Sequence, residues 1–181
     1  MEIINTRISE VKILIPEVFG DDRGFFMETW RENWFHTHIS KSYFVQENHS
    51  YSRQGVLRGL HYQTDKPQGK LVRVITGSVF DVAVDMRKSS NTFGQWVGVL
   101  LSDENKSQLW IPEGFAHGFY VTSKTAELVY RCTNYYNSAA EQSVRWDDPD
   151  LAIDWPLVNG IAPLISAKDT HGDWFKDAFT F

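Results

Sequence analysis

Short runs of β-branched, aromatic and other apolar residues follow one another along most of this chain, and turn residues separate them. The run Val79–Met86 alternates with a period of two, which is typical of a half-buried strand, and Thr76-Gly-Ser78 before it suits a tight turn. Similar runs lie at Val11–Ile15, Tyr43–Ser50, Leu71–Thr76, Gln95–Leu101, Gln108–Ile111, Phe115–Thr122 and Ala126–Cys132. Their spacing predicts a mainly β chain that folds as a sandwich or barrel.

One helix and an irregular C-terminal segment are expected around these strands. Thr29 is a candidate N-cap with Glu32 three residues later, which predicts a helix near Thr29–Ile39. After Asp147 the chain is richer in Pro, Asp and Gly, so we expect short helical turns there. No repeat or Pro-rich linker divides the 181 residues, and this predicts a single domain over 1–181.

Composition excludes several classes of protein. A net charge of −5 argues against a nucleic-acid-binding protein, which normally presents a basic face. No apolar run approaches the roughly 18 residues needed to span a membrane. The single Cys132 excludes an intramolecular disulfide, and the N-terminus lacks the pattern of a signal peptide. We therefore expect a cytoplasmic protein.

Two short motifs suggest which barrel the strands form. Gly55-Val-Leu-Arg-Gly-Leu-His61 and Pro112-Glu-Gly-Phe-Ala-His117 resemble the two half-motifs of cupins. Cupins commonly bind a metal through His-x-His and a glutamate in the first half-motif, but here Gln63 replaces the second histidine and no glutamate follows before Gly77. Because zinc and iron prefer three or four protein ligands, we expect no metal here. His117 is then either structural or a substrate contact.

Polar residues interrupt the β pattern near the first half-motif. The run Gln46-Glu-Asn-His-Ser50 is unusually polar for a strand, which indicates a lined pocket on one face of that strand. Arg58 and His61 are three positions apart, so their side chains lie on opposite faces of a regular strand unless a bulge intervenes. The remaining histidines have no comparable context, and we interpret them as surface or structural.

Ordered motifs along most of the chain resemble the dTDP-4-dehydrorhamnose 3,5-epimerase family. They are Asp22-Arg-Gly-Phe-Phe26, Gln46–Ser50, Leu57–Gln63, Gln68–Arg73, Gly77–Asp85, Trp110–Gly118, Thr133-Asn-Tyr-Tyr136 and Ser166-Ala-Lys-Asp169. The resemblance implies a cupin-like double-stranded β-helix (jelly-roll) barrel with short peripheral helices, which is usually a homodimer and needs no cofactor. It implies epimerisation at C3 and C5 of dTDP-4-dehydro-6-deoxy-D-glucose, a dTDP-linked 4-keto-6-deoxyhexose, in dTDP-L-rhamnose biosynthesis.

Epimerisation beside a ketone needs a base, an acid on the opposite face and a positive group at the enolate oxygen. The resemblance implies His61 as the base, Asp169 as its carboxylate partner, Tyr130 as the acid and Lys70 at the oxyanion. Each residue type suits its role, since histidine titrates near neutrality and tyrosine stays protonated there. From the sequence alone, Tyr130 can equally be an ordinary strand aromatic, Lys70 a solvated strand-end lysine and Asp169 a turn or helix cap.

The resemblance also implies which residues bind the nucleotide and the sugar. Arg23 and Arg58 suit the diphosphate because a guanidinium matches phosphate oxygens, while Phe26 and Tyr136 suit stacking on thymine. The polar contacts implied are Glu28, Gln46, Asn48, His117, Glu141 and Lys168.

Three other functions remain open at this point. A single-position epimerase, of C3 or of C5, would share His61, Asp169 and Lys70. A sugar-nucleotide-binding cupin without catalysis would not need the complete acid–base set. A metal-dependent cupin oxygenase or isomerase is disfavoured by Gln63 and the missing glutamate.

Overall fold

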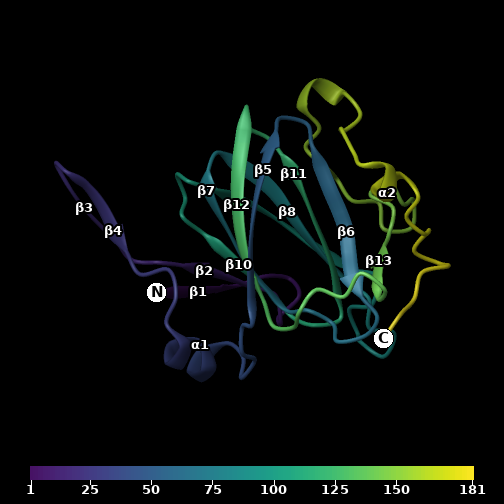
Figure 1. Cartoon of the computed structure of the whole chain (residues 1–181), viewed down its shortest axis with the longest axis horizontal. Coiled ribbons are helices and arrows are strands. Elements are labelled where there is room, and N and C mark those ends of the chain that lie inside the picture. Colours follow the sequence, from purple (N-terminus) through teal and green to yellow (C-terminus); the bar gives the residue numbers. More distant parts are fainter.

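Two antiparallel sheets face each other in the computed structural model, which describes all 181 residues (Figure 1). The six-stranded sheet contains, in spatial order, β1 (Glu2–Asn5), β2 (Lys12–Ile15), β10 (Gln108–Ile111), β7 (Lys70–Thr76), β12 (Thr125–Cys132) and β5 (Gln46–Arg53). The five-stranded sheet contains β13 (Glu141–Ser143), β6 (Leu57–Gln63), β11 (Phe115–Val121), β8 (Ser78–Asp85) and β9 (Trp96–Ser102). This mainly β, cupin-like arrangement confirms the predicted fold class.

The helices are few and peripheral. They are α1 (Glu32–His38), a 3-10 turn at Val158–Gly160 and α2 (Ala167–Thr170). The helix expected at Thr29–Ile39 exists, but the predicted cap was wrong, because Arg31 occupies the N-cap position and makes no side-chain capping bond. The Thr29 carbonyl instead accepts a hydrogen bond from Gln108 at 3.0 Å, which ties this segment to the sheet before the helix begins. None of the helices has the length and apolar character needed to cross a membrane.

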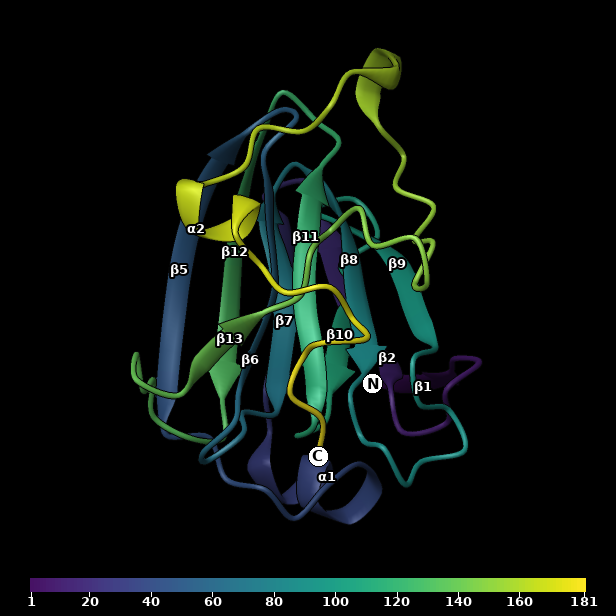
Figure 2. The same cartoon turned by 90° about the vertical axis from the view of Figure 1, so that its right-hand side faces the viewer.

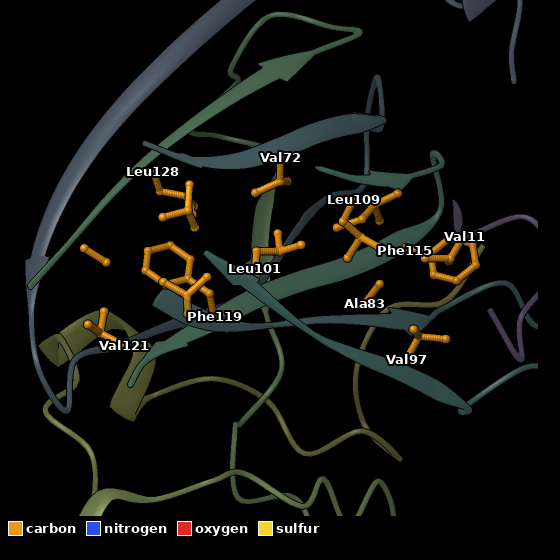
Figure 3. Close-up of a cluster of buried hydrophobic side chains, with 14 of the residues drawn as sticks. Val11, Val72, Ala83, Val97, Leu101, Leu109, Phe115, Phe119, Val121 and Leu128 are labelled. Atoms are coloured by element: carbon orange, nitrogen blue, oxygen red, sulfur yellow. The ribbon is translucent and has the colours of Figure 1, made fainter. Parts of the chain in front are cut away.

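Apolar side chains from both sheets fill the space between them (Figure 3). Val72 and Leu128 of the six-stranded sheet meet Ala83, Leu101 and Phe119 of the other sheet in this cluster. Burial of such side chains stabilises the fold by about 25 cal/mol for each Å² removed from water. This core occupies part of the barrel interior and leaves the remainder to polar side chains.

The outer face of the five-stranded sheet is also covered, which corrects the prediction that Val79–Met86 is half-buried. Figure 2 shows the C-terminal segment crossing β6 and β11, and its Phe175 and Phe181 pack on a second cluster that contains Val82 and Met86. Both faces of β8 are therefore buried, although the alternating sequence suggested one solvated face.

Several strand boundaries differ from those expected. The strand predicted at Tyr43–Ser50 begins at Gln46 and continues to Arg53. β1, β13 and the separate hairpin of β3 (Val18–Asp21) and β4 (Gly24–Met27) were not predicted as strands. The turn of this hairpin lies between Asp21 and Gly24, which pair with each other at its end.

A β-bulge in β6 brings Arg58 and His61 to the same face. His117 of β11 pairs with His61, whereas Phe119 pairs with Arg58, so β6 has one residue more than β11 between these pairs. Gly59 lies in the bulge with φ +122°, and a Cβ there would lie 2.5 Å from Gly118 Cα. The sequence predicted opposite faces for Arg58 and His61 unless a bulge intervened, and the structure has that bulge.

Candidate active site

Two adjoining cavities open between the sheets and share His61, Lys70 and Tyr130 in their walls. The outer compartment, of about 210 Å³, is otherwise lined by Gln46, Asn48, Tyr62, Gln63, Gln68, Tyr136 and Glu141. The inner compartment, of about 200 Å³, is otherwise lined by Ser50, Arg58, His117, Gly118 and Phe119. His61 comes from the five-stranded sheet, and Lys70 and Tyr130 come from the facing sheet. The three proposed reacting groups therefore approach one space from two walls.

His61 is hydrogen-bonded to Asp169, as the resemblance implied. His61 Nε2 lies 2.5 Å from Asp169 Oδ1, and the Asp169 side chain is only 3% exposed. A carboxylate only accepts hydrogen bonds, so Nε2 carries the proton and Nδ1 of the neutral ring is left unprotonated. Burial tends to raise the pKa of Asp169, but hydrogen bonds from His61 and Ser166 bring it below the usual value. Asp169 is therefore ionised and holds the His61 ring in one orientation, with Nδ1 able to accept a proton.

A second histidine–aspartate pair lies deeper in the barrel. His117 Nε2 is 3.0 Å from both carboxylate oxygens of Asp81, and both side chains are buried. Burial lowers the pKa of His117 and outweighs the opposing effect of Asp81. His117 is therefore neutral and held in one orientation on the wall of the inner compartment. Asp81 was missed at the sequence level, although an aspartate between Val79 and Ala83 on an apolar face was a usable signal.

Lys70 is buried rather than solvated, which rules out the strand-end alternative. Its side chain is 8% exposed, and no carboxylate lies within ion-pair distance. Burial lowers the pKa of Lys70, while nearby Cys132 and Asp81 oppose that shift. An ammonium group with no protein counter-ion in a cavity wall is suited to a developing oxyanion.

Tyr130 lies beside His117 at the wall of both compartments. The two ring centroids are 6.4 Å apart in an edge-to-face arrangement. Burial raises the pKa of Tyr130, and Asn48, its partner across β5 and β12, opposes that shift. The phenol is thus protonated at neutral pH and available as a proton donor.

Hydrogen bonds organise the mouth of the outer compartment. Glu141 accepts a bond of 2.5 Å from the Tyr136 hydroxyl and forms an ion pair with Lys168. Burial tends to raise the pKa of Glu141, but Lys168 and Tyr136 lower it below the usual value. The Tyr136 amide donates to Gln46 at 2.9 Å. These predicted binding residues thus form one connected rim.

Three predicted binding residues are not brought to this cavity within one chain. Arg23 and Phe26 lie on the β3–β4 hairpin, where the Arg23 side chain is 90% exposed and Phe26 is 70% exposed. Glu28 follows the hairpin and pairs with Arg31 at 2.8 Å. Figure 1 shows that this hairpin projects away from the two sheets. Their predicted roles therefore require something beyond a single chain.

Gln63 occupies the position where cupins commonly have a metal-binding histidine. Its amide donates to the carbonyls of Lys66 and Tyr135 and accepts from the Asn137 amide at 2.8 Å. No group of three His, Cys, Asp or Glu side chains is arranged to hold a metal ion. Gln63 instead ties two loops to the wall of the outer compartment.

Comparisons with known proteins agree with this geometry. The family model described as dTDP-4-dehydrorhamnose 3,5-epimerase matches residues 5–177. A Shigella flexneri protein with that name is 55% identical over 183 residues, which cover 100% of this chain and 99% of the relative. A Neisseria gonorrhoeae protein with the same name is 59% identical over 98% of this chain, which spans 54% of that relative's length.

A solved structure is similarly close. It is a dTDP-6-deoxy-D-glucose-3,5-epimerase from Legionella pneumophila in complex with dTDP-4-keto-L-rhamnose, and it is 53% identical in sequence. It matches with a TM-score of 0.94 over 97% of this chain and 93% of that chain. With its fold, its two-walled cavity and these relatives, the chain belongs to the dTDP-4-dehydrorhamnose 3,5-epimerase family.

Proposed function

We propose that His61, Asp169, Lys70 and Tyr130 carry out the family's reaction in this chain. That reaction inverts C3 and C5 of dTDP-4-dehydro-6-deoxy-D-glucose to give dTDP-4-dehydro-L-rhamnose, in dTDP-L-rhamnose biosynthesis, and it makes the chain an isomerase. The observation that carries the proposal is the hydrogen bond between His61 and the ionised Asp169 on one wall of a cavity whose facing wall supplies Lys70 and Tyr130.

The first step removes a proton from a carbon next to the C4 ketone. His61 Nδ1 accepts this proton, and the electron pair of the broken C–H bond moves into an enolate whose negative charge lies on the C4 oxygen. Asp169 stabilises the imidazolium that forms, because its charge lies against Nε2. Lys70 stabilises the enolate oxygen in a site where burial strengthens the interaction.

The second step returns a proton to the same carbon from the other face. Tyr130 supplies it from the wall opposite His61. The Tyr130 phenolate then takes up a proton from solvent and the His61 imidazolium releases its proton to solvent, so both groups return to their starting states. A repeat of both steps at the second carbon completes the double inversion. Each cycle conserves charge and needs no oxidant, reductant or cofactor.

The compartments divide the substrate between them in this proposal. Tyr136, Gln46, Asn48, Glu141 and Lys168 bind the nucleoside end at the outer rim. Arg58 and His117, in the inner compartment, contact the diphosphate and the sugar.

Arg23, Phe26 and Glu28 complete the site in a homodimer, according to this proposal. The hairpin exposes Phe19, Phe25 and Phe26 to solvent, and such an apolar arm is stabilised when it packs on another chain. Its arginine and aromatic ring would add a diphosphate contact and a thymine-stacking contact to those that the cavity of one chain supplies. The homodimer and the cytoplasmic location stay predictions.

Mixed dimers test the arm directly. His61→Ala and Arg23→Ala chains are each expected to be nearly inactive, and after co-refolding the mixed dimer regains one intact site if the arm acts on its partner. If both separate variants are inactive and the mixture stays inactive, Arg23 acts within its own chain, and an Arg23→Ala variant that is active by itself would show that Arg23 is not needed.

Heavy water tests the reaction itself. Incubation with dTDP-4-dehydro-6-deoxy-D-glucose in deuterium oxide should place deuterium at both C3 and C5. Label at one carbon alone would identify a single-position epimerase, and absence of label would favour the non-catalytic binding protein. Metal analysis of the purified protein is the parallel check, since stoichiometric iron or zinc needed for activity would overturn the metal-free mechanism.

A further inference from the structure

The inward face of β5 carries a row of four polar side chains. Gln46, Asn48, Ser50 and Ser52 alternate with exposed residues along the strand. Gln46 donates to Asn48 Oδ1 at 2.9 Å, Asn48 donates weakly to Cys132 Sγ at 3.7 Å, and Ser52 Oγ accepts from Arg58 Nε at 3.1 Å. Three members of the row are therefore satisfied by the protein itself.

Ser50 is the exception. Its Oγ is the one buried side-chain nitrogen or oxygen in the chain that makes no hydrogen bond to a protein group. Leaving such an atom without a partner costs free energy, so an exception in a well-packed protein calls for an explanation. Here the explanation lies in its position, because Ser50 lines the inner compartment together with His61, Lys70 and Tyr130.

We propose that the Ser50 hydroxyl is a substrate-binding group that hydrogen-bonds an oxygen substituent of the reacting hexose. This inference rests on the proposed function. At about 3.3 Å per residue, Ser50 lies about 13 Å along β5 from Gln46 at the nucleoside rim. It shares its compartment with the groups assigned to the reacting sugar, so the sugar is the part of the substrate within its reach. A hydroxyl both donates and accepts, which suits a sugar hydroxyl.

Ser50→Ala separates this role from a structural one. The variant removes an unsatisfied buried oxygen, so the Tm should stay unchanged or rise, whereas kcat/KM for the keto sugar should fall roughly three- to tenfold. The dissociation constant for dTDP, which lacks the hexose, should remain within about twofold of wild type. Ser50→Thr keeps the hydroxyl and should recover part of the lost kcat/KM.

Ser52→Ala is the matched comparison on the same strand face. Its hydroxyl holds Arg58, so this variant should lower the Tm and weaken dTDP binding, the opposite pattern to Ser50→Ala. An unchanged kcat/KM in Ser50→Ala would overturn the inference. An equal loss in dTDP affinity would place the contact on the diphosphate and overturn the sugar assignment. Failure of wild-type enzyme to label C3 or C5 would instead refute the proposed function, so the two failures are distinguishable.

Discussion

His61 Nε2 lies 2.5 Å from Asp169 Oδ1, although 108 residues separate the two in sequence. The bond assigns the proton to Nε2 and frees Nδ1, which lets a histidine on β6 act as a base. Asp169 is placed by α2, where Ser166 Oγ accepts a hydrogen bond of 3.1 Å from the Asp169 amide. A four-residue helix near the C-terminus thus completes a site built on the barrel strands.

Replacement of His61 should stop proton exchange without stopping nucleotide binding. In His61→Ala, deuterium incorporation should fall by roughly 10²- to 10⁴-fold, since a positioned base contributes about that factor. Calorimetric titration with dTDP should give nearly wild-type affinity. His49→Ala, on the outward face of β5, is the control and should retain full activity. Residual exchange near the wild-type rate would remove His61 from the role of base.

Asp169→Asn should leave the fold intact and impair the base. An amide cannot supply the negative charge that stabilises the imidazolium, and it also allows the wrong tautomer of His61. We expect kcat to fall roughly 10²- to 10⁴-fold with KM changed little. Steady-state kinetics measures this split. A rise in KM alone would mean that Asp169 acts only in substrate binding.

Lys70→Met should stabilise the protein while it removes activity. Replacing a buried, unpaired ammonium by a similar apolar chain should raise the Tm on the order of 2–8 °C at neutral pH. Loss of the oxyanion partner should lower kcat roughly 10²- to 10³-fold. Exposed Lys88→Met is the control for both measurements.

Wild type and Lys70→Met should also differ in how their stability depends on pH. Burial holds the pKa of Lys70 below its unfolded value, so between these two values the unfolded chain binds more protons than the folded chain. Wild-type stability should therefore rise relative to Lys70→Met as the pH increases toward about 10.4. Denaturant unfolding of both proteins between pH 7 and pH 10 should show that the difference between their free energies of unfolding becomes smaller as the pH rises. A constant difference would indicate that Lys70 titrates as an exposed lysine does.

Tyr130→Phe should separate the two half-reactions. Removal of the phenolic proton should slow turnover by roughly 10²-fold or more, while His61 can still remove and return a proton on its own face. Deuterium should then enter the recovered substrate faster than product forms. Tyr51→Phe, on the exposed face of β5, serves as the control. Equal loss of exchange and turnover would assign Tyr130 a structural role.

Gly59→Ala should destabilise the bulge that aligns Arg58 with His61. A side chain at φ +122° is strained, and its Cβ would lie 2.5 Å from Gly118 Cα and 2.7 Å from the His117 carbonyl. We expect a loss of about 2–4 kcal/mol in the free energy of unfolding, together with reduced activity. Gly20→Ala is the matched control, since its Cβ would meet only the Gly24 carbonyl at 3.6 Å. Denaturant unfolding compares the two.

Local patterns predicted the class of fold because alternation and turn residues act over a few positions. Most strands of the two sheets appear near their expected ranges, and Gln108–Ile111 matches β10. The predictions of burial and of helix capping were wrong where segments far apart in the sequence make the deciding contacts. The alternation in β8 predicted one exposed face, but the C-terminal segment covers that face. Thr29 was predicted to cap the helix, but its carbonyl accepts a hydrogen bond from Gln108 of β10.

The sequence by itself determined the β-rich fold, the family and the residue types that the chemistry needs, because these depend on local pattern and side-chain identity. Only the tertiary structure decided which of those residues meet. The bulge turns Arg58 and His61 to one face, the fold buries Lys70 without a counter-ion, and Ser50 is left free beside them. Phe26 and Arg23, in contrast, lie on a projecting hairpin. Such contacts depend on strand register and on the packing of segments far apart in sequence, and no short stretch of residues encodes either.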